Sequence, residues 1–146
     1  MLIKTERKFE SAHRQFGDTS KCGKLHGHNW LVEIEVEGTP GVLGYIVDFK
    51  KLCDIVDRLD HKVLLQEDDP LVLVLREYSQ EVVTFKVNPT CENLAYYFLE
   101  SFAELLNNER SRWQVIYVAV YENDISNAME NLHNPDFIND RLEDFE

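Results

Sequence analysis

Hydrophobic and polar residues alternate most regularly between Asn29 and Glu37. A period of two places successive side chains on opposite faces of a β-strand, so this segment predicts a half-buried strand. The apolar face of that strand consists of Trp30, Val32, Ile34 and Val36. Shorter runs predict further strands over residues 2–9, 82–87 and 115–121.

Two segments instead carry apolar residues at helical spacing, from Phe49 to Leu59 and from Leu94 to Leu106. Asp48 precedes the first segment and Thr90 the second, and the side-chain oxygens of both residue types cap helix N-termini. Glu92 lies in the first turn of the second helix, where a negative charge is favourable. The pattern therefore predicts two capped amphipathic helices.

Residues 63–76 fit two interpretations, because Pro70 can open a short helix whereas Val72–Val74 would also suit a strand. The remaining elements follow the order ββαβαβ. This order predicts an α+β domain over residues 1–131, in which an antiparallel sheet carries two main helices on one face. Residues 132–146 are predicted to form an acidic C-terminal tail at the surface.

Composition narrows the class of protein. The formal net charge of −12 excludes non-specific nucleic-acid binding, which requires a basic surface. The three cysteines, an odd number at wide spacing, argue against a disulfide framework and suit a reducing compartment. The charged N-terminal residues do not resemble a signal peptide, and no apolar run reaches the roughly 20 residues of a membrane span. We therefore expect a cytoplasmic protein.

Three histidines suggest a metal site. His26 and His28 are two residues apart and, in an extended chain, project from the same face as Trp30. His13 follows the first predicted strand, so an antiparallel pairing of the first two strands would bring it beside the other two. Three imidazoles that leave an open fourth position are typical of catalytic Zn²⁺. An isolated histidine is more often an ordinary core or surface residue, but this spacing favours metal.

Cys22 has two interpretations that the sequence leaves open. As a fourth ligand it would close the site and make the zinc structural. As a neighbour of the metal it would transfer protons, with Lys21, Lys24 and Arg14 supplying positive charge nearby. Cys53 and Cys91 lie in the helical patterns and are interpreted as packing residues.

Two carboxylates admit both a functional and a structural interpretation. Asp60 and His61 could form an acid–base pair, although adjacent residues do not face each other on a helix, so the helix would have to end first. The first helix is predicted to end near Asp60–His61, so His61 could instead interact favourably with the C-terminus of that helix. Glu122 ends the last predicted strand, where it could accept two hydrogen bonds from a guanidine-like heterocycle or simply be solvated.

Together these segments resemble the 6-pyruvoyl-tetrahydropterin synthase superfamily. The matching segments occur in the order of the family and cover most of residues 4–122: Phe9–Arg14, Cys22–Asn29, Gly44–Phe49, Leu59–His61, Pro89–Ala95 and Glu122. The spacing Cys-x3-His-x-His is similar to the 6-carboxy-tetrahydropterin synthase branch of the queuosine and archaeosine pathway.

The resemblance implies a tunnelling fold (T-fold) that assembles as a trimeric β-barrel, often doubled to a hexamer, with active sites between subunits. It also implies zinc on the three histidines, proton transfer by Cys22, Asp60 and His61, and a pterin held by Glu122 with help from Thr90. We add the neighbouring Glu92 to this expected binding set.

The resemblance implies a zinc-dependent lyase that converts 7,8-dihydroneopterin triphosphate to 6-carboxy-5,6,7,8-tetrahydropterin, acetaldehyde and triphosphate. Within the family, triphosphate elimination or an aldolase-type cleavage would use the same ligands. Outside it, the chain could be a zinc-stabilised structural oligomer. The loop that carries Arg14, Lys21 and Lys24 is predicted to receive the triphosphate, since phosphate binding needs local cations. Two departures concern the substrate: no Thr or Ser closely follows Glu122, and the segment from Gln66 to Asn88 is long.

Overall fold

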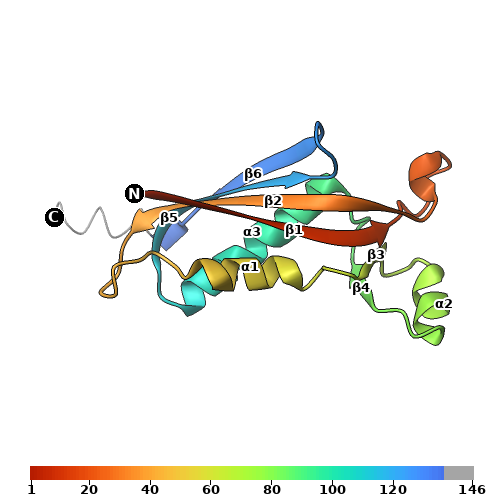
Figure 1. The fold of residues 1–146 in the computed structure, drawn as a ribbon, viewed down its shortest axis with the longest axis horizontal. Helices are drawn as coiled ribbons and strands as arrows, with labels where there is room; N and C mark the ends of the chain where they lie inside the picture. Colours follow the sequence, from red (N-terminus) through yellow and green to blue (C-terminus); the bar gives the residue numbers. More distant parts are fainter. Residues whose placement is uncertain (137–146) are drawn as a thin grey trace.

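The protein folds around one six-stranded sheet with the strand order β4-β3-β1-β2-β5-β6, as the computed structural model of residues 1–136 shows (Figure 1). The strands are antiparallel from β1 through β2 and β5 to β6, whereas β3 pairs in parallel with both β1 and β4. Their bounds are β1 (Leu2–His13), β2 (His26–Thr39), β3 (Val63–Gln66), β4 (Val82–Phe85), β5 (Arg112–Tyr121) and β6 (Asn127–His133).

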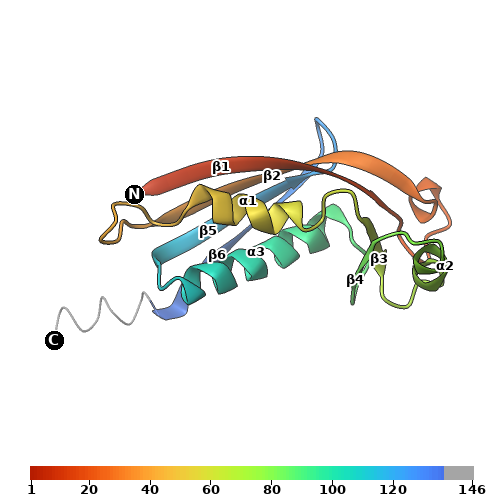
Figure 2. The ribbon, with the colours of Figure 1, turned by 60° about the horizontal axis from the view of Figure 1, so that its bottom comes forward.

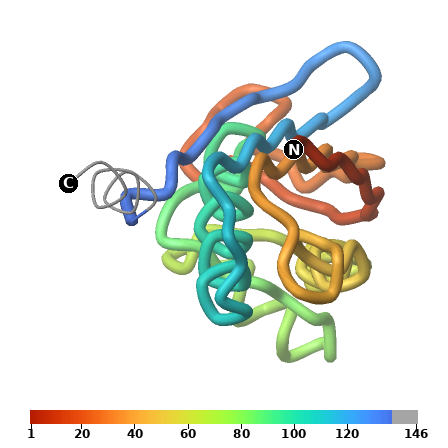
Figure 3. Tube along the Cα trace, turned by 90° about the vertical axis from the view of Figure 1, so that its left-hand side faces the viewer, coloured from red at the N-terminus to blue at the C-terminus, as the bar shows by residue number. Residues whose placement is uncertain are grey.

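The helices α1 (Phe49–Asp57) and α3 (Cys91–Asn108) lie along the same face of the sheet (Figure 2). The end-on view shows them side by side beneath the strands, with no described helix on the opposite face (Figure 3). The short helix α2 (Leu71–Glu77) lies next to β3 and β4, at the end of the molecule away from the N-terminus. This confirms the predicted α+β architecture and its two main helices on one face. The prediction of a wholly antiparallel sheet is wrong, because β3 pairs in parallel with β1 and β4.

The core lies between these two helices and the inward face of the sheet. Phe9 on β1 stacks on Trp30 of β2 with ring centroids 5.7 Å apart, and Phe98 of α3 meets Phe9 edge-on at 6.0 Å. Trp30 is fully buried, and its indole N–H donates to the Ser11 carbonyl at 3.1 Å. A buried aromatic with its polar atom satisfied combines a large apolar contact area with a fixed orientation.

Both predicted helix caps are present. Asp48 accepts a hydrogen bond from the Lys50 N–H at 2.9 Å, and Thr90 accepts one from the Asn93 N–H at 3.2 Å. The first helix ends at Asp57, before the predicted end near Asp60–His61. The ambiguous segment 63–76 forms both a strand and a helix, with β3 first and α2 opening directly after Pro70.

Strand β6 was not predicted. Its inward positions, paired with apolar residues of β5, are Ala128, Glu130 and Leu132, so no apolar alternation marks it. The strand continues to His133, so the first two residues of the predicted tail lie in the sheet, whereas residues 137–146 lie outside the described residues. None of the described helices is long and apolar enough to cross a membrane.

Candidate metal centre

The register of β1 and β2 brings the three histidines together. His13 lies directly opposite His26, and His28 follows two residues along the same face of β2. The ring centroids of His13 and His26 are 4.7 Å apart, those of His13 and His28 are 5.0 Å apart, and those of His26 and His28 are 4.8 Å apart. This is the convergence that the strand pattern predicts, and it requires only an antiparallel hairpin.

Hydrogen bonds fix which nitrogen atoms point toward the cluster. The Nδ1 atom of His13 lies 2.8 Å from the Pro89 carbonyl oxygen, and that of His26 lies 2.6 Å from the Lys24 carbonyl oxygen. A carbonyl only accepts hydrogen bonds, so each Nδ1 carries the proton and each Nε2 keeps a free lone pair. Such outer hydrogen bonds are the usual orienting partners of metal-bound histidines.

Two Nε2 atoms of the histidine cluster lack a hydrogen-bond partner among the described residues. The Nε2 atoms of His13 and His28 are buried and accept or donate no hydrogen bond within residues 1–136. A buried polar atom without a hydrogen-bond partner is energetically costly. Two such atoms side by side indicate that a group from outside the protein chain binds them. Burial also lowers the pKa of both histidines, which favours the neutral imidazole that binds metal. The residues therefore fit a metal ion.

Glu122 joins this cluster from the end of β5. One ligand atom from each of His13, His26, His28 and Glu122 lies within 4.8 Å of all the others. The Oε1 atom of Glu122 is 3.2 Å from Nε2 of His28, a close contact that does not have hydrogen-bond geometry. The sequence placed Glu122 with the substrate, and this position suits either a pterin-binding or a metal-binding carboxylate.

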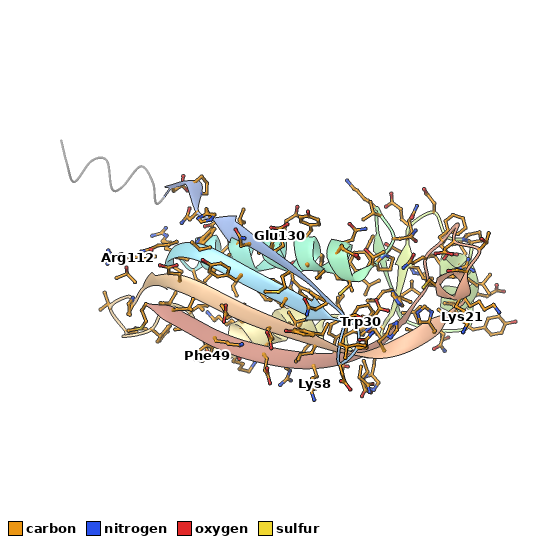
Figure 4. All side chains as sticks on the ribbon, turned by 90° about the horizontal axis from the view of Figure 1, so that it is seen from above. Lys8, Lys21, Trp30, Phe49, Arg112 and Glu130 are labelled. Carbon is orange, nitrogen blue, oxygen red and sulfur yellow. The ribbon has the colours of Figure 1, made fainter. Side chains whose placement is uncertain are left out.

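Cys22 lies apart from the four converging groups. It occupies a single 3-10 turn, η1 (Lys21–Gly23), and its N–H is capped by the Ser20 hydroxyl at 3.3 Å. Its thiol is partly exposed and does not belong to the set of ligand atoms that converge in residues 1–136. A closed Cys-His₃ site is therefore not present in this arrangement. Lys21 and Lys24 beside it are exposed, and Lys21 lies at the end of the molecule opposite Arg112 (Figure 4).

Asp60 and His61 contact each other directly. Because α1 has ended at Asp57, His61 adopts a left-handed backbone with φ of 58°, and its Nδ1 lies 2.9 Å from Oδ2 of Asp60. The other carboxylate oxygen accepts the Glu10 N–H at 2.9 Å, and this bond, with His61, lowers the pKa of Asp60. The condition that the helix ends before the pair is therefore met.

The Asp60–His61 pair is nevertheless separate from the histidine cluster. His61 lines an open hollow of about 470 Å³ together with Gly27 and Asn29, which alternate with the cluster histidines along β2, and with the cluster residue His28 between them. Alternating residues face opposite sides of a sheet, so this hollow is on the outward side. Within residues 1–136, neither Asp60 nor His61 belongs to the four converging ligand groups, although His61 and His28 border the same hollow.

The other predicted substrate-binding residues lie in different settings. Thr90 caps α3. It directly follows Pro89, whose carbonyl oxygen contacts the His13 ring, so Thr90 is one residue away from a contact of the cluster. Glu92 is exposed in the first turn of α3. Arg14 makes a two-pronged ion pair with the buried Asp69, so its charge is already matched within the protein.

Comparisons with known proteins agree with this geometry. Residues 2–131 match the family described as 6-pyruvoyl tetrahydropterin synthase. The chain belongs to that family. It is 34% identical over 137 residues to a Pyrococcus abyssi protein named putative 6-carboxy-5,6,7,8-tetrahydropterin synthase, with 84% of each chain covered. A Rickettsia bellii protein named 6-carboxy-5,6,7,8-tetrahydropterin synthase is 31% identical over 120 residues, which cover 75% of this chain and 87% of that one.

The fold is also found among solved structures. The Plasmodium falciparum 6-pyruvoyl tetrahydropterin synthase superposes with a TM-score of 0.68 at 20% identity, covering 92% of this chain and 98% of that one. This likeness identifies the same fold. Membership in the family confirms the resemblance drawn from the sequence and the prediction that the chain is a lyase-type enzyme of the tetrahydropterin synthases.

Proposed function

We propose that this protein is a zinc-dependent lyase that converts 7,8-dihydroneopterin triphosphate to 6-carboxy-5,6,7,8-tetrahydropterin, acetaldehyde and triphosphate. The observation that carries the proposal is the convergence of three histidines with two buried, unpartnered Nε2 atoms. The names of the Pyrococcus and Rickettsia relatives favour this reaction over the other reactions of the family.

In this proposal His13, His26 and His28 hold the metal. Zinc bound there would act as a Lewis acid that lowers the pKa of substrate hydroxyl groups. The histidine cluster faces inward against Trp30, whose ring centroid lies 5.0 Å from that of His13 and 5.2 Å from that of His28. This wall orients the imidazoles and limits the access of water to them.

The substrate would be anchored by carboxylate and backbone groups near the N-terminus of α3. Glu122 can accept two hydrogen bonds from the guanidine-like edge of a pterin, with Thr90 and Glu92 close to the same helix end. Lys21 and Lys24, both exposed, supply positive charge for the triphosphate. Arg14, which the sequence pattern places with the phosphate, is not part of this proposal, because its charge is paired with Asp69.

Proton transfer would be shared between two sites. Cys22, on the turn before the histidines, acts on the side chain of the bound substrate. Asp60 orients His61 through the 2.9 Å contact and keeps Nε2 of that ring available to donate or accept a proton. Because the pair lies on the outward side, it would serve a site on a neighbouring subunit.

The proposed assembly is a trimer or a dimer of trimers with active sites at subunit interfaces. Two features support it: the outward face of the sheet is not covered by any described helix, and β4 and β6 are edge strands in the described sheet. Natural proteins rarely leave long sheet edges open. A cytoplasmic location fits the three cysteines, which are free in this structure.

Product analysis with the zinc-loaded enzyme tests the reaction. Incubation with 7,8-dihydroneopterin triphosphate should yield the masses of 6-carboxy-tetrahydropterin and acetaldehyde. The mass of 6-pyruvoyl-tetrahydropterin would instead identify triphosphate elimination. Cleavage of the bond between the first two side-chain carbons, with the triphosphate retained on the two-carbon fragment as glycolaldehyde triphosphate, would identify an aldolase-type reaction.

One variant separates the enzyme from a zinc-stabilised structural oligomer. Cys22→Ala should retain zinc and lose turnover, because the thiol lies outside the converging ligands. Weakened zinc binding together with a lower thermal stability would support the structural alternative instead. Cys53→Ala, which changes a partly buried thiol of α1, is the matched control.

A further inference from the structure

Arg14 and Asp69 form the most buried ion pair among the described residues. The Nε atom of Arg14 lies 2.6 Å from Oδ2 of Asp69, and its NH2 nitrogen lies 2.5 Å from Oδ1. The Asp69 side chain is 0% exposed and that of Arg14 is 23% exposed. Oδ1 also accepts the Leu71 N–H at 2.9 Å at the start of α2, so the carboxylate is fully satisfied.

Such a pair is a weak source of stability. The Coulomb attraction is largely offset by the cost of removing both charges from water. What a two-pronged guanidinium–carboxylate pair does supply is a defined geometry, because the planar fork matches the two oxygen atoms in only one arrangement. The position of this pair in the chain therefore matters more than its energy.

Arg14 directly follows His13, and Phe16 shortly after it is also held by hydrogen bonds from a distant segment. Asn88 accepts the Phe16 N–H through Oδ1 at 2.7 Å, and its Nδ2 donates to the Phe16 carbonyl at 3.0 Å. Pro89 holds the His13 ring. The chain leaving β1 toward Cys22 is thus attached at three successive points to segments 55 to 76 residues away in sequence.

We propose that Asp69 is a positioning residue for the candidate metal centre. By holding Arg14 it fixes the end of β1 that carries His13 and the start of the loop that carries Cys22. This inference rests on the proposed function, in which His13 binds the metal. It gives a role to the connection between β3 and α2, which contains none of the proposed pterin-binding or metal-binding residues.

The chain offers a matched control on β1, the strand that Arg14 directly follows. Arg7 also makes a two-pronged pair, with Nε 2.8 Å from Oδ1 and NH2 2.9 Å from Oδ2 of Asp57 on α1. Asp69→Asn and Asp57→Asn each remove one charge from an Arg–Asp fork, but only the first fork adjoins a histidine of the cluster. Each full-length variant would be assayed for zinc affinity by chelator competition and for the visible spectrum of its Co²⁺ form. The rate at which iodoacetamide alkylates Cys22 would be measured in the metal-free protein.

Asp69→Asn should weaken zinc binding about tenfold, the lower end of the range for groups that orient metal ligands. It should also alter the Co²⁺ spectrum and change the Cys22 alkylation rate, whereas Asp57→Asn should match the wild type in all three. Equal zinc affinity and equal Cys22 alkylation in the two variants would overturn the proposal. If the wild type bound no zinc, the proposed function would fail, but the Cys22 alkylation rate would still decide whether Asp69 positions the loop.

A milder pair of variants covers the case in which Asp69→Asn does not fold. Arg14→Lys keeps the positive charge but loses the fork, and Arg7→Lys makes the same change at the control pair. A shift of the Co²⁺ spectrum and of Cys22 alkylation in Arg14→Lys alone would support positioning. Unchanged values in both lysine variants would contradict it.

Discussion

His13 and His26 lie directly opposite each other in the ladder between β1 and β2, and their ring centroids are 4.7 Å apart. The candidate metal centre therefore depends on strand register. A slip of one residue would turn His26 and His28 to the outward face, because side chains alternate along a strand. Trp30, two residues beyond His28 and fully buried, opposes that slip because it would also have to leave the core.

Glu122→Gln distinguishes the two roles that the position of Glu122 allows. We expect zinc affinity to be retained and KM for the pterin substrate to rise about 10- to 100-fold, because the variant loses a charged hydrogen-bond acceptor. Zinc competition and steady-state kinetics measure the two quantities. Glu130→Gln on β6 is the control. A loss of zinc affinity in Glu122→Gln would assign the carboxylate to the metal instead.

Lys24→Glu tests the phosphate-binding loop. Lys24 is exposed beside the turn that carries Cys22, so reversing its charge should raise KM for the triphosphate substrate while zinc affinity stays the same. The effect should decrease as ionic strength rises, because exposed charges are screened. Lys8→Glu, an exposed lysine on β1, is the comparison variant. An unchanged KM would exclude Lys24 from this role.

Gly23→Ala should disturb the turn that carries Cys22. A Cβ atom at residue 23 would lie 1.9 Å from the Asp18 carbonyl oxygen, so the backbone of the loop must move. Displacement of a catalytic group by about 1 Å can reduce turnover by as much as about 100-fold. We expect a large decrease in kcat with little change in Tm. Gly41→Ala has no contact closer than 3.7 Å and should behave as wild type, and equal kcat values for the two variants would contradict this expectation.

Cys91 should resist alkylation in the folded protein. Burial raises the pKa of its thiol to about 11, so almost none of it is thiolate at pH 8. Cys22 and Cys53 are partly exposed and should react first with iodoacetamide. Peptide mass spectrometry at successive times gives the order. Early modification of Cys91 under native conditions would show that this part of α3 opens readily.

Asp69 should make stability depend on pH in the acid range. Burial opposes ionisation of Asp69, but the bonds from Arg14 and the Leu71 N–H outweigh it, so the pKa of Asp69 is lowered. Between the lowered pKa of the folded state and the unfolded-state pKa of about 3.9, the unfolded state therefore binds more protons than the folded state. The stabilisation is present above about pH 5 and is lost as the pH falls through the folded-state pKa.

The difference in unfolding free energy between wild type and Asp69→Asn should therefore decrease between pH 6 and about pH 3. Urea unfolding of the metal-free proteins at several pH values measures this difference, and the other titrating groups cancel in the comparison. A constant difference across that range would show that the negative charge of Asp69 does not contribute to the unfolding free energy.

The sequence could predict the local parts of this architecture. Alternation and spacing located the first two strands, the two capped helices and the three converging histidines, because each depends on neighbouring residues. Strand β6 escaped prediction because Glu130 occupies an inward position, and an apolar pattern is the only local sign of a strand. Its place is set by pairing with β5.

The missing parts of the site are the long-range ones. Nothing local distinguishes Asp69 from the exposed Glu67 and Asp68 before it, since its burial depends on Arg14, 55 residues away. Glu122 reaches the histidines only because β5 pairs with β2. The candidate ligands were therefore predictable, but the groups that hold them were not.

The three histidines lie within the first 28 residues, whereas Asp69, Pro89 and Glu122 come later in the chain. A ribosome that makes this protein from its N-terminus therefore releases the imidazoles well before the residues that orient them. The β1–β2 hairpin can collect the ligands as soon as it forms, since closing a loop of a dozen residues is fast. Convergence of the three histidines and completion of the four-residue cluster are thus separate events during synthesis, and Glu122 is the last of the four residues to be made.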